Sequence, residues 1–197
     1  MPASQRRVTP EDIIPDAEFR TQRKDRRAAL LPKKKLRRVD LGPYCTAYFE
    51  TYETMLFQIQ EMLLIEGGGP AQLVDEMAAY NPLIPQGGEL VATVMFEIDD
   101  PLRRANILAR LGGVEDHFFI QIGDSRSQAR QEGDIERTRE DGKTSSVHFL
   151  RFPITPEQAA AFRDPKVTVM LGADHPLYDH RAILSDATRA ELAGDLD

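Results

Sequence analysis

The 197-residue sequence predicts an α+β fold built around a ferredoxin-like unit with the order β-α-β-β-α-β. Two observations support this fold class. Four segments rich in β-branched and aromatic residues are typical of strands, at 89–98, 114–122, 145–154 and 166–173. Two segments with helix signals separate the first strand from the second and the third from the fourth.

The ends of these two helices are marked by their capping residues. In "DDPLRRANILARLGG", Asp100 can cap the helix, Pro101 suits its first turn and glycine ends it. The second helix begins with a capping box formed by Thr155 and Gln158. Both helices cover one face of a ferredoxin-like sheet, so the other face needs a different cover.

The N-terminal half offers that cover. "LRRVDL" and "YCTAYFE" predict two short strands around a turn at residues 42–43. The segment 53–66 predicts a helix that is apolar on more than one side, which is typical of a helix buried between layers. A further helix over 71–80 is expected to bury Val74 among its apolar residues. We therefore expect this half to pack on the open face of the sheet.

These segments predict a single domain over residues 1–197. We expect it to comprise a basic helical arm (1–38), a hairpin with two helices (39–88), the ferredoxin-like unit (89–175) and a C-terminal tail with a helix (176–197). The helix of the arm should run from Asp16 to about Leu31, where Pro32 is expected to end it.

Composition indicates a soluble globular protein of the cytoplasm. Hydrophobic residues make up 41% and charged residues 29%, and no apolar run approaches the roughly 18 residues that would span a bilayer. The first residues lack the apolar stretch of a secretory signal. The single cysteine, Cys45, excludes an internal disulfide and any multi-cysteine metal site, and we expect it in the core.

Charge is distributed unevenly along the chain. Residues 1–40 hold 12 Lys and Arg against 6 Asp and Glu, whereas the remainder holds 13 against 26. The run 20–38 has ten basic residues opposed only by Asp25. It could contact phosphates, or it could be a solvated helix face or arm that docks on the acidic body of the same protein or of a partner. A homo-oligomer is a separate alternative. It contains no aromatic stacking residue, which disfavours nucleic acid.

The segment 123–145 carries five basic and six acidic residues and almost nothing apolar. This composition predicts a long mobile loop between strands, and a lid that orders on binding is one alternative.

Several ionisable residues are candidates for a site between the two halves. Glu61 shares a helical stripe with Gln58 and has apolar neighbours, so it needs a partner. That partner could be structural, with Arg151 as the candidate, or Glu61 could be a base or metal ligand. Strand alternation places His117 with residues 119 and 121, and Glu97 and Arg151 alternate similarly. Four side chains could therefore converge between the layers: Glu61, Glu97, His117 and Arg151. The catalytic candidates among them are Glu61, His117 and Arg151.

The motif "LGADHPLYDHR" (171–181) holds two histidines and two aspartates. A divalent metal could bind Glu61, Asp174 and His175 if these side chains converge. The alternative is a polar turn in which Asp174 caps, Pro176 stiffens the chain and Tyr178 packs back. Gln58, Glu97 and Tyr178 are candidate binding residues. The sequence contains no phosphate-binding glycine loop and no nucleophile elbow.

One set of stretches resembles an uncharacterised bacterial family, a domain of unknown function: "LGPYCTAYFE", "FQIQEML", "YNPLIPQGGELVATVMFEI", "GVEDHFFIQIGD", "SSVHFLRF" and "LGADHPLYDH". The similarity runs from about Arg38 to Tyr178. Genes of that family often lie beside those for rubrerythrin-like proteins and iron–sulfur oxidoreductases, so the resemblance implies a role in peroxide or redox defence. The family pattern covers Glu50, Gln58, Glu61, Asp174, His175, Pro176 and Tyr178, but not His180, and it supplies no known catalytic residue.

Two functional hypotheses follow. The first is a non-enzymatic accessory protein that binds a rubrerythrin-like or iron–sulfur redox partner. The second is a small enzyme or metal-binding protein that uses Glu61, His117 and His175.

Overall fold

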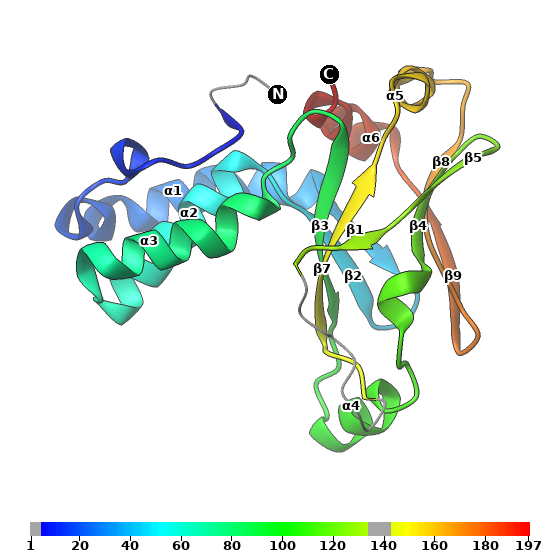
Figure 1. Ribbon diagram of the computed structural model, residues 1–197, viewed down its shortest axis with the longest axis horizontal. Coiled ribbons are helices and arrows are strands. Elements are labelled where there is room, and N and C mark those ends of the chain that lie inside the picture. The colour runs from blue at the N-terminus through cyan, green and yellow to red at the C-terminus, as the bar shows by residue number, and fades with distance from the viewer. Residues whose placement is uncertain (1–4, 134–142) are drawn as a thin grey trace.

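The computed structural model describes residues 5–133 and 143–197, and within them the strands form two antiparallel sheets (Figure 1). Sheet A has the order β1 (Arg38–Leu41), β2 (Cys45–Phe49), β3 (Glu89–Phe96), β7 (Val147–Pro153) and β6 (Arg130–Gln131). Sheet B has the order β5 (Ser125–Gln128), β4 (Phe118–Ile122), β8 (Val169–His175) and β9 (Tyr178–Ile183).

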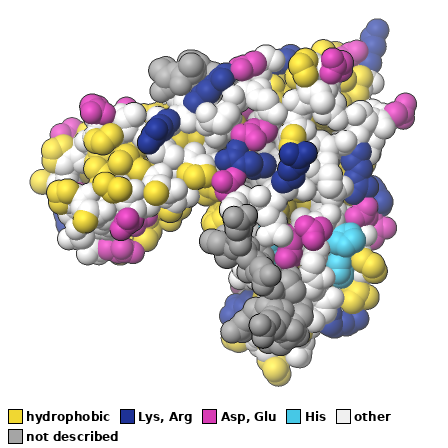
Figure 2. Space-filling model, viewed as in Figure 1, with side chains coloured by type: hydrophobic (Ala, Val, Ile, Leu, Met, Phe, Trp, Pro, Cys, Tyr) yellow, Lys and Arg dark blue, Asp and Glu magenta, His cyan; other side chains and the backbone are white. Residues whose placement is uncertain are grey.

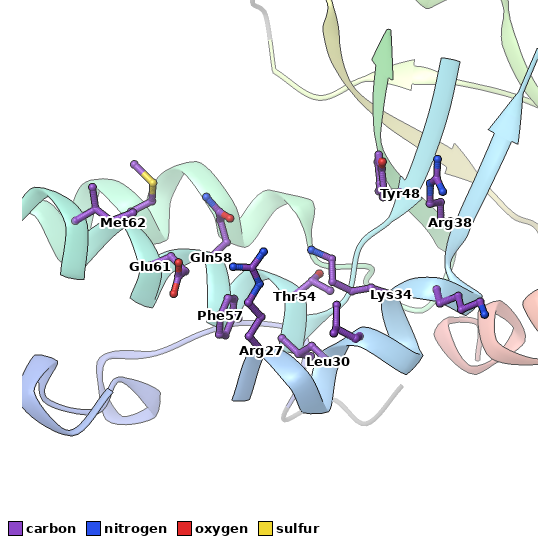
Figure 3. Close-up of a pocket in the computed structure, with 13 residues that line it drawn as sticks. Arg27, Leu30, Lys34, Arg38, Tyr48, Thr54, Phe57, Gln58, Glu61 and Met62 are labelled. Atoms are coloured by element: carbon purple, nitrogen blue, oxygen red, sulfur yellow. The ribbon is translucent and has the colours of Figure 1, made fainter. Parts of the chain in front are cut away.

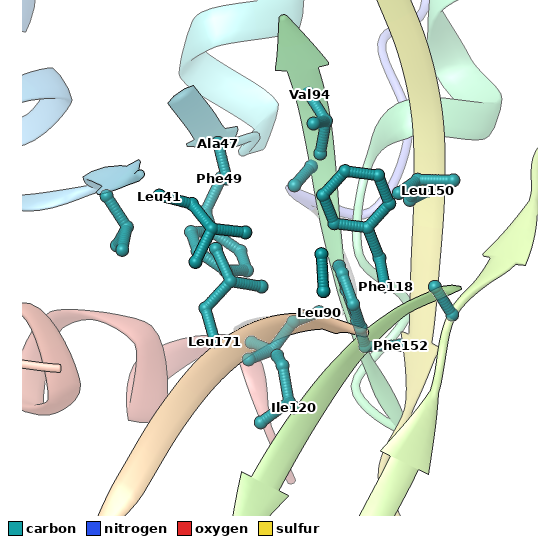
Figure 4. Packing of buried hydrophobic residues seen from close by; sticks show 14 of the residues in the cluster. Leu41, Ala47, Phe49, Leu90, Val94, Phe118, Ile120, Leu150, Phe152 and Leu171 are labelled. Atoms are coloured by element: carbon teal, nitrogen blue, oxygen red, sulfur yellow. The ribbon is translucent and has the colours of Figure 1, made fainter. Parts of the chain in front are cut away.

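The main core lies between the two sheets (Figure 4). Alternate residues of β3 and β7 point inward from sheet A, and alternate residues of β4 and β8 face them from sheet B, as the strand period of two requires. The inward set includes Leu90, Val94, Phe118, Ile120, Leu150, Phe152 and Leu171. Cys45 is buried in this core, as expected. The two sheets therefore form a β-sandwich.

The α+β class is confirmed, but the ferredoxin-like order is not. In that order β3 and β7 would be central and flanked by β8 and β4 in one sheet. Here β3 and β7 do pair, but β2 and β6 occupy their outer edges, and β4 pairs with β8 in the second sheet. Alternation specifies which face of a strand is buried, whereas it leaves open which strand supplies the hydrogen-bonding neighbour.

Three helices form a lobe beside the sandwich: α1 (Asp16–Leu36), α2 (Tyr52–Glu66) and α3 (Gly69–Tyr80). Figure 1 shows this helical lobe extending away from the sheets, with α2 between its neighbours. Met55, Ile59 and Leu63 of α2 form a second apolar cluster, which sheet A joins through the outward side chains of Val91 and Phe149. The expectation that α2 lies across the sheet was therefore wrong over most of its length.

Shorter helices cover the ends of the sandwich. Figure 1 shows α4 (Pro101–Leu108) at one end and α5 (Pro156–Arg163) and α6 (Asp186–Leu192) at the other. The predicted caps are present: Asp100 accepts from the amide of Arg103, and Thr155 and Gln158 form the capping box. In the described part of the chain, no helix combines the length and apolar character needed to cross a membrane.

Four local expectations differ from the structure. The helix of the arm continues through Pro32 to Leu36, and Val74 is 61% exposed rather than buried. Residues 125–128 and 130–131 form strands, while 134–142 of the expected loop lie outside the described residues. Residues 178–183 form β9, which pairs with β8 across a tight turn.

Arg37 ends α1 and connects it to distant parts of the chain. The amide of Arg37 donates to the carbonyls of Lys33 and Lys34, which closes the last turn. The guanidinium, only 2% exposed, donates to the carbonyl oxygens of Phe49 and Glu50 and pairs with Asp195. One side chain thus joins the end of α1, the chain entering α2 and the C-terminal segment.

Replacing Arg37 with Met should lower the free energy of unfolding by about 3–5 kcal/mol, because Asp195 would remain buried without its partner. Urea denaturation measures this change. Arg38→Met is the matched control, because Arg38 pairs with Asp40 at an exposed position and its loss should cost less than about 1 kcal/mol. Equal effects of the two substitutions would contradict the assigned role of Arg37.

Candidate functional site

A groove of about 690 Å³ lies between α1 and α2, where the helical lobe meets the first strands (Figure 3). We call it the basic groove. Its apolar surface comes from both helices and consists of Leu30, Leu31, Phe57, Met62 and Ile65. Its cationic side chains come from α1 and the start of β1 and are Arg27, Lys34, Lys35 and Arg38. The polar remainder is Tyr48, Thr54, Gln58 and Glu61.

Helical periodicity places these residues on the groove. Arg27, Leu31 and Lys34 are four and three positions apart on α1, so they share one face of that helix. The groove residues of α2 follow the same spacing of three or four positions: Thr54, then Phe57 and Gln58, then Glu61 and Met62, and finally Ile65. Figure 3 shows the labelled members of both sets beside the space between the two helices.

Glu61 has a partner, and it is Arg23 rather than Arg151. The Nε of Arg23 lies 2.7 Å from Oε1 of Glu61 and Nη2 lies 2.6 Å from Oε2, which is the bidentate geometry of a strong pair. This pair joins α1 to α2 at the groove and neutralises the only carboxylate among the groove residues. Gln58 donates to the hydroxyl of Tyr80 on α3 at 3.3 Å.

The positive charges of the groove are less compensated. Lys33 pairs with Glu53 and Arg38 with Asp40. Among the described residues, no carboxylate forms an ion pair with Arg27, Lys34 or Lys35. The groove therefore presents an apolar floor beside cations whose charge is balanced mainly by solvent.

Arg151 lies away from this groove, whereas Glu97 borders it through its contact with Tyr48. Arg151 points outward from β7, where it pairs with Glu89 and Glu132 and donates to the carbonyl of Pro82. Glu97 follows β3 and accepts hydrogen bonds from Thr46 at 2.6 Å and Tyr48 at 2.9 Å. The structure does not bring Glu61, Glu97, His117 and Arg151 together, because α2 leaves the sheet and each residue has separate neighbours.

A second polar cluster lies at the end of β8. The 3₁₀ helix η4 (Val114–His117) leads into β4 and places His117 beside Asp174, with Nδ1 at 3.0 Å from Oδ1. Arg126 donates to the other oxygen of Asp174 at 2.8 Å. The ring of His175 meets that of His117 edge to face, with centroids 5.1 Å apart. We call His117, Arg126, Asp174 and His175 the histidine cluster.

Two groups of the histidine cluster, Asp174 and His175, have lowered pKa values. Partial burial opposes the ionisation of Asp174, but hydrogen bonds from Arg126 and His117 outweigh it and lower its pKa. Burial, followed by the nearby charge of His117, lowers the pKa of His175. The amide of Leu177 donates to Nδ1 of His175 at 3.2 Å. In a neutral ring of His117 that donates from Nδ1 to Asp174, Nε2 would be the acceptor atom.

The outer face of sheet B holds Arg126 in place. A Cβ atom added to Gly172 would lie 2.3 Å from the ring of Phe119, so glycine allows that ring to lie flat on β8. The guanidinium of Arg126 covers the ring, with Cζ 3.6 Å from its centroid. As alternation predicted, Phe119 lies on the face opposite Phe118 and Ile120.

The remaining residues of the 171–181 motif are structural. Tyr178 is buried and donates from its hydroxyl to the carbonyl of Leu41 at 2.5 Å, so it packs back on the chain. Its ring also contacts that of His180, with centroids 4.5 Å apart.

The structure does not bring the three predicted metal ligands together. Glu61 lies in the helical lobe, apart from Asp174 and His175. The described residues contain no group of three or more His, Cys, Asp or Glu arranged to hold a metal ion.

Sequence reasoning missed two buried polar groups. One is Arg37 with Asp195. The other joins Glu115, Thr144 and His148, in which Thr144 lies 3.2 Å from the carboxylate of Glu115 and 3.4 Å from Nε2 of His148. Only strand alternation could have indicated the second group, because it places His148 on the face of β7 opposite to that of its neighbour Val147.

We expect His175 to titrate below the ordinary pKa of 6.5 in an NMR experiment on its imidazole, because its charged form is disfavoured by burial and by His117. In His117→Gln the midpoint should rise. Since the unfolded chain binds this proton more readily, the contribution to stability is complete above pH 6.5 and is lost as the pH falls. A midpoint at or above 6.5 would show the assignment to be wrong.

Comparison with known proteins gives a family and a structural relative. Residues 7–196 match the family described as a protein of unknown function, DUF3501. A crystal structure of a protein of unknown function from Burkholderia pseudomallei has a TM-score of 0.88 and 34% sequence identity, covering 96% of this chain and 99% of that one. No curated protein matches. With the family match spanning nearly the whole sandwich and helical lobe, the chain belongs to the DUF3501 family.

Proposed function

We propose that this protein is a non-enzymatic accessory protein of the cytoplasm that binds an acidic segment of a partner protein in the basic groove. The observation that carries the proposal is the groove itself, where Arg27, Lys34 and Lys35 stand beside an apolar floor without an ion-pair partner among the described residues. Such a surface is complementary to a ligand that carries both carboxylates and apolar side chains.

Exposed apolar residues favour a macromolecule over a small ligand. Leu31 is 57% exposed and Ile65 is 67% exposed, on the two walls of the groove. Figure 2 shows further apolar side chains gathered over the helical lobe, where Val74 is also exposed. A small molecule within the groove would leave much of Leu31 and Ile65 in water, whereas a protein partner would cover both.

The partner that we propose is a redox protein of peroxide defence, either rubrerythrin-like or an iron–sulfur protein. The resemblance of the family stretches supports this choice, and the net charge of the basic arm supports an acidic surface on the partner. Nucleic acid is the weaker candidate because the groove offers Phe57 and Tyr48 alone as aromatic surfaces and its floor is largely aliphatic.

Charge reversal tests this function. Arg27→Glu with Lys34→Glu should abolish recovery of a redox protein in a pull-down from the native cytoplasm at low salt, followed by mass spectrometry. Arg20→Glu with Lys24→Glu is the matched control, because both residues are exposed on α1 and outside the groove, and the net charge change is equal. Failure of the unaltered protein to recover any redox protein would refute the proposal.

A second candidate function is supported by the histidine cluster. Asp174 orients His117 so that its Nε2 can accept a proton or bind a metal, which is the outer-sphere support that such histidines use. We expect metal analysis of protein purified without chelator or affinity tag to find no stoichiometric metal. Stoichiometric iron, zinc or manganese that is lost in His117→Ala or His175→Ala would favour this second function instead.

A further inference from the structure

We infer that the occupant of the basic groove is an amphipathic, acidic α-helix of about three turns, which packs against α1 and α2. This inference rests on the proposed function and specifies the form of the partner segment.

The walls of the groove favour a helix over an extended peptide. Both walls are α-helices, whose backbone amides and carbonyls are already paired within each helix. An extended peptide binds tightly when it adds a strand to a sheet edge, because that edge pairs its backbone groups. No such edge is available between α1 and α2, whereas a helix brings its own backbone hydrogen bonds and needs only side-chain contacts.

The spacing of the wall residues matches the side chains of a third helix. Thr54 and Ile65 are eleven positions apart on α2, so the wall is about 16 Å long at the α-helical rise of 1.5 Å per residue. That length corresponds to about three turns. Phe57 and Met62 on α2 and Leu30 on α1 form the floor, into which apolar residues at positions i, i+3 or i+4, and i+7 would insert.

The charges of the groove orient this helix about its axis. The cations Arg27, Lys34 and Lys35 all belong to α1, whereas the single carboxylate of the opposite wall, Glu61, is neutralised by Arg23. Acidic residues of the bound helix would therefore face α1, and its apolar stripe would face the floor. Lys33 does not contribute because it is paired with Glu53.

The other flank of α2 already binds a helix of this kind. Leu73 and Met77 of α3 pack into the apolar cluster of α2, while α3 also carries Asp75 and Glu76. α3 is thus a short acidic amphipathic helix held by α2 through apolar contacts. The basic groove offers a similar site on the opposite flank, with the addition of complementary charge from α1.

Designed peptides test the inference with the full-length protein. The probe is a fluorescent 15-residue peptide with Leu at helical spacing and Glu elsewhere. One control has a central Pro, and another has the same composition in scrambled order. In fluorescence anisotropy at low salt, the helical probe should bind at least about tenfold more tightly than either control, because only it presents one apolar stripe as a helix. Circular dichroism should show added helix on binding.

Variants assign this binding to the groove. Arg27→Glu with Lys34→Glu should weaken binding of the helical probe at least about tenfold, as should Phe57→Asp at the floor, whereas Arg20→Glu with Lys24→Glu should not. Equal binding of all three peptides, or equal weakening by both double variants, would overturn the helical inference and indicate nonspecific attraction of acidic chains. Recovery of a redox protein in the pull-down would still support the proposed function.

Two further outcomes are decisive. Absence of binding by the helical probe, in protein whose unfolding curve is normal, would overturn the inference. Light scattering could instead show a stable dimer. If that dimer dissociates both in Val74→Glu and in the double variant Arg27→Glu with Lys34→Glu, the occupant is α3 of a second copy. That result would overturn a partner protein as the occupant.

Discussion

The position of the helical lobe depends on one buried guanidinium, that of Arg37. The backbone amide of Arg37 closes the last turn of α1, while its guanidinium donates to the carbonyls of Phe49 and Glu50 just before α2 and pairs with Asp195 near the C-terminus. Burial of a charge is favourable only when its hydrogen-bonding groups are satisfied, so all these segments must meet at one point. Glu50 adds a second link, because its carboxylate accepts from Thr54 of α2 and Thr93 of β3 at 2.7 Å each. This junction holds the end of α1 beside the start of α2, and the pair of Arg23 and Glu61 joins the same two helices at the basic groove.

The groove and the histidine cluster belong to different parts of the molecule and have different chemistry. The groove combines uncompensated cations with exposed apolar side chains on the helical lobe, which suits recognition of a large amphipathic ligand. In the histidine cluster, by contrast, most charge is satisfied locally: Asp174 holds both Arg126 and His117, and Arg126 covers Phe119. For this reason the groove is the stronger basis for a function, and the cluster is secondary.

Several elements could be predicted from local sequence, because their causes are local. The capping box of Thr155 and Gln158, the left-handed glycine at Gly67 that ends α2, and the alternation of Phe118 and Phe119 all involve residues close in the chain. The need of Glu61 for a partner was predicted correctly, since its charge and its apolar neighbours along the helix can be read from the sequence. The identity of that partner was not, because Arg23 is 38 positions away on another helix.

The sequence by itself determined the α+β class, most of the helices and strands, and the inward face of the central strands, since capping, helical period and strand alternation act over a few residues. Tertiary structure alone decided that β2 and β6 flank β3 and β7, that β4 and β8 form a separate sheet, and that α2 leaves the sheet to form the groove with α1. The physical reason is that hydrogen-bonding edges are interchangeable between strands of similar pattern. Selection among them depends on long-range contacts such as those of Arg37, which no local pattern records.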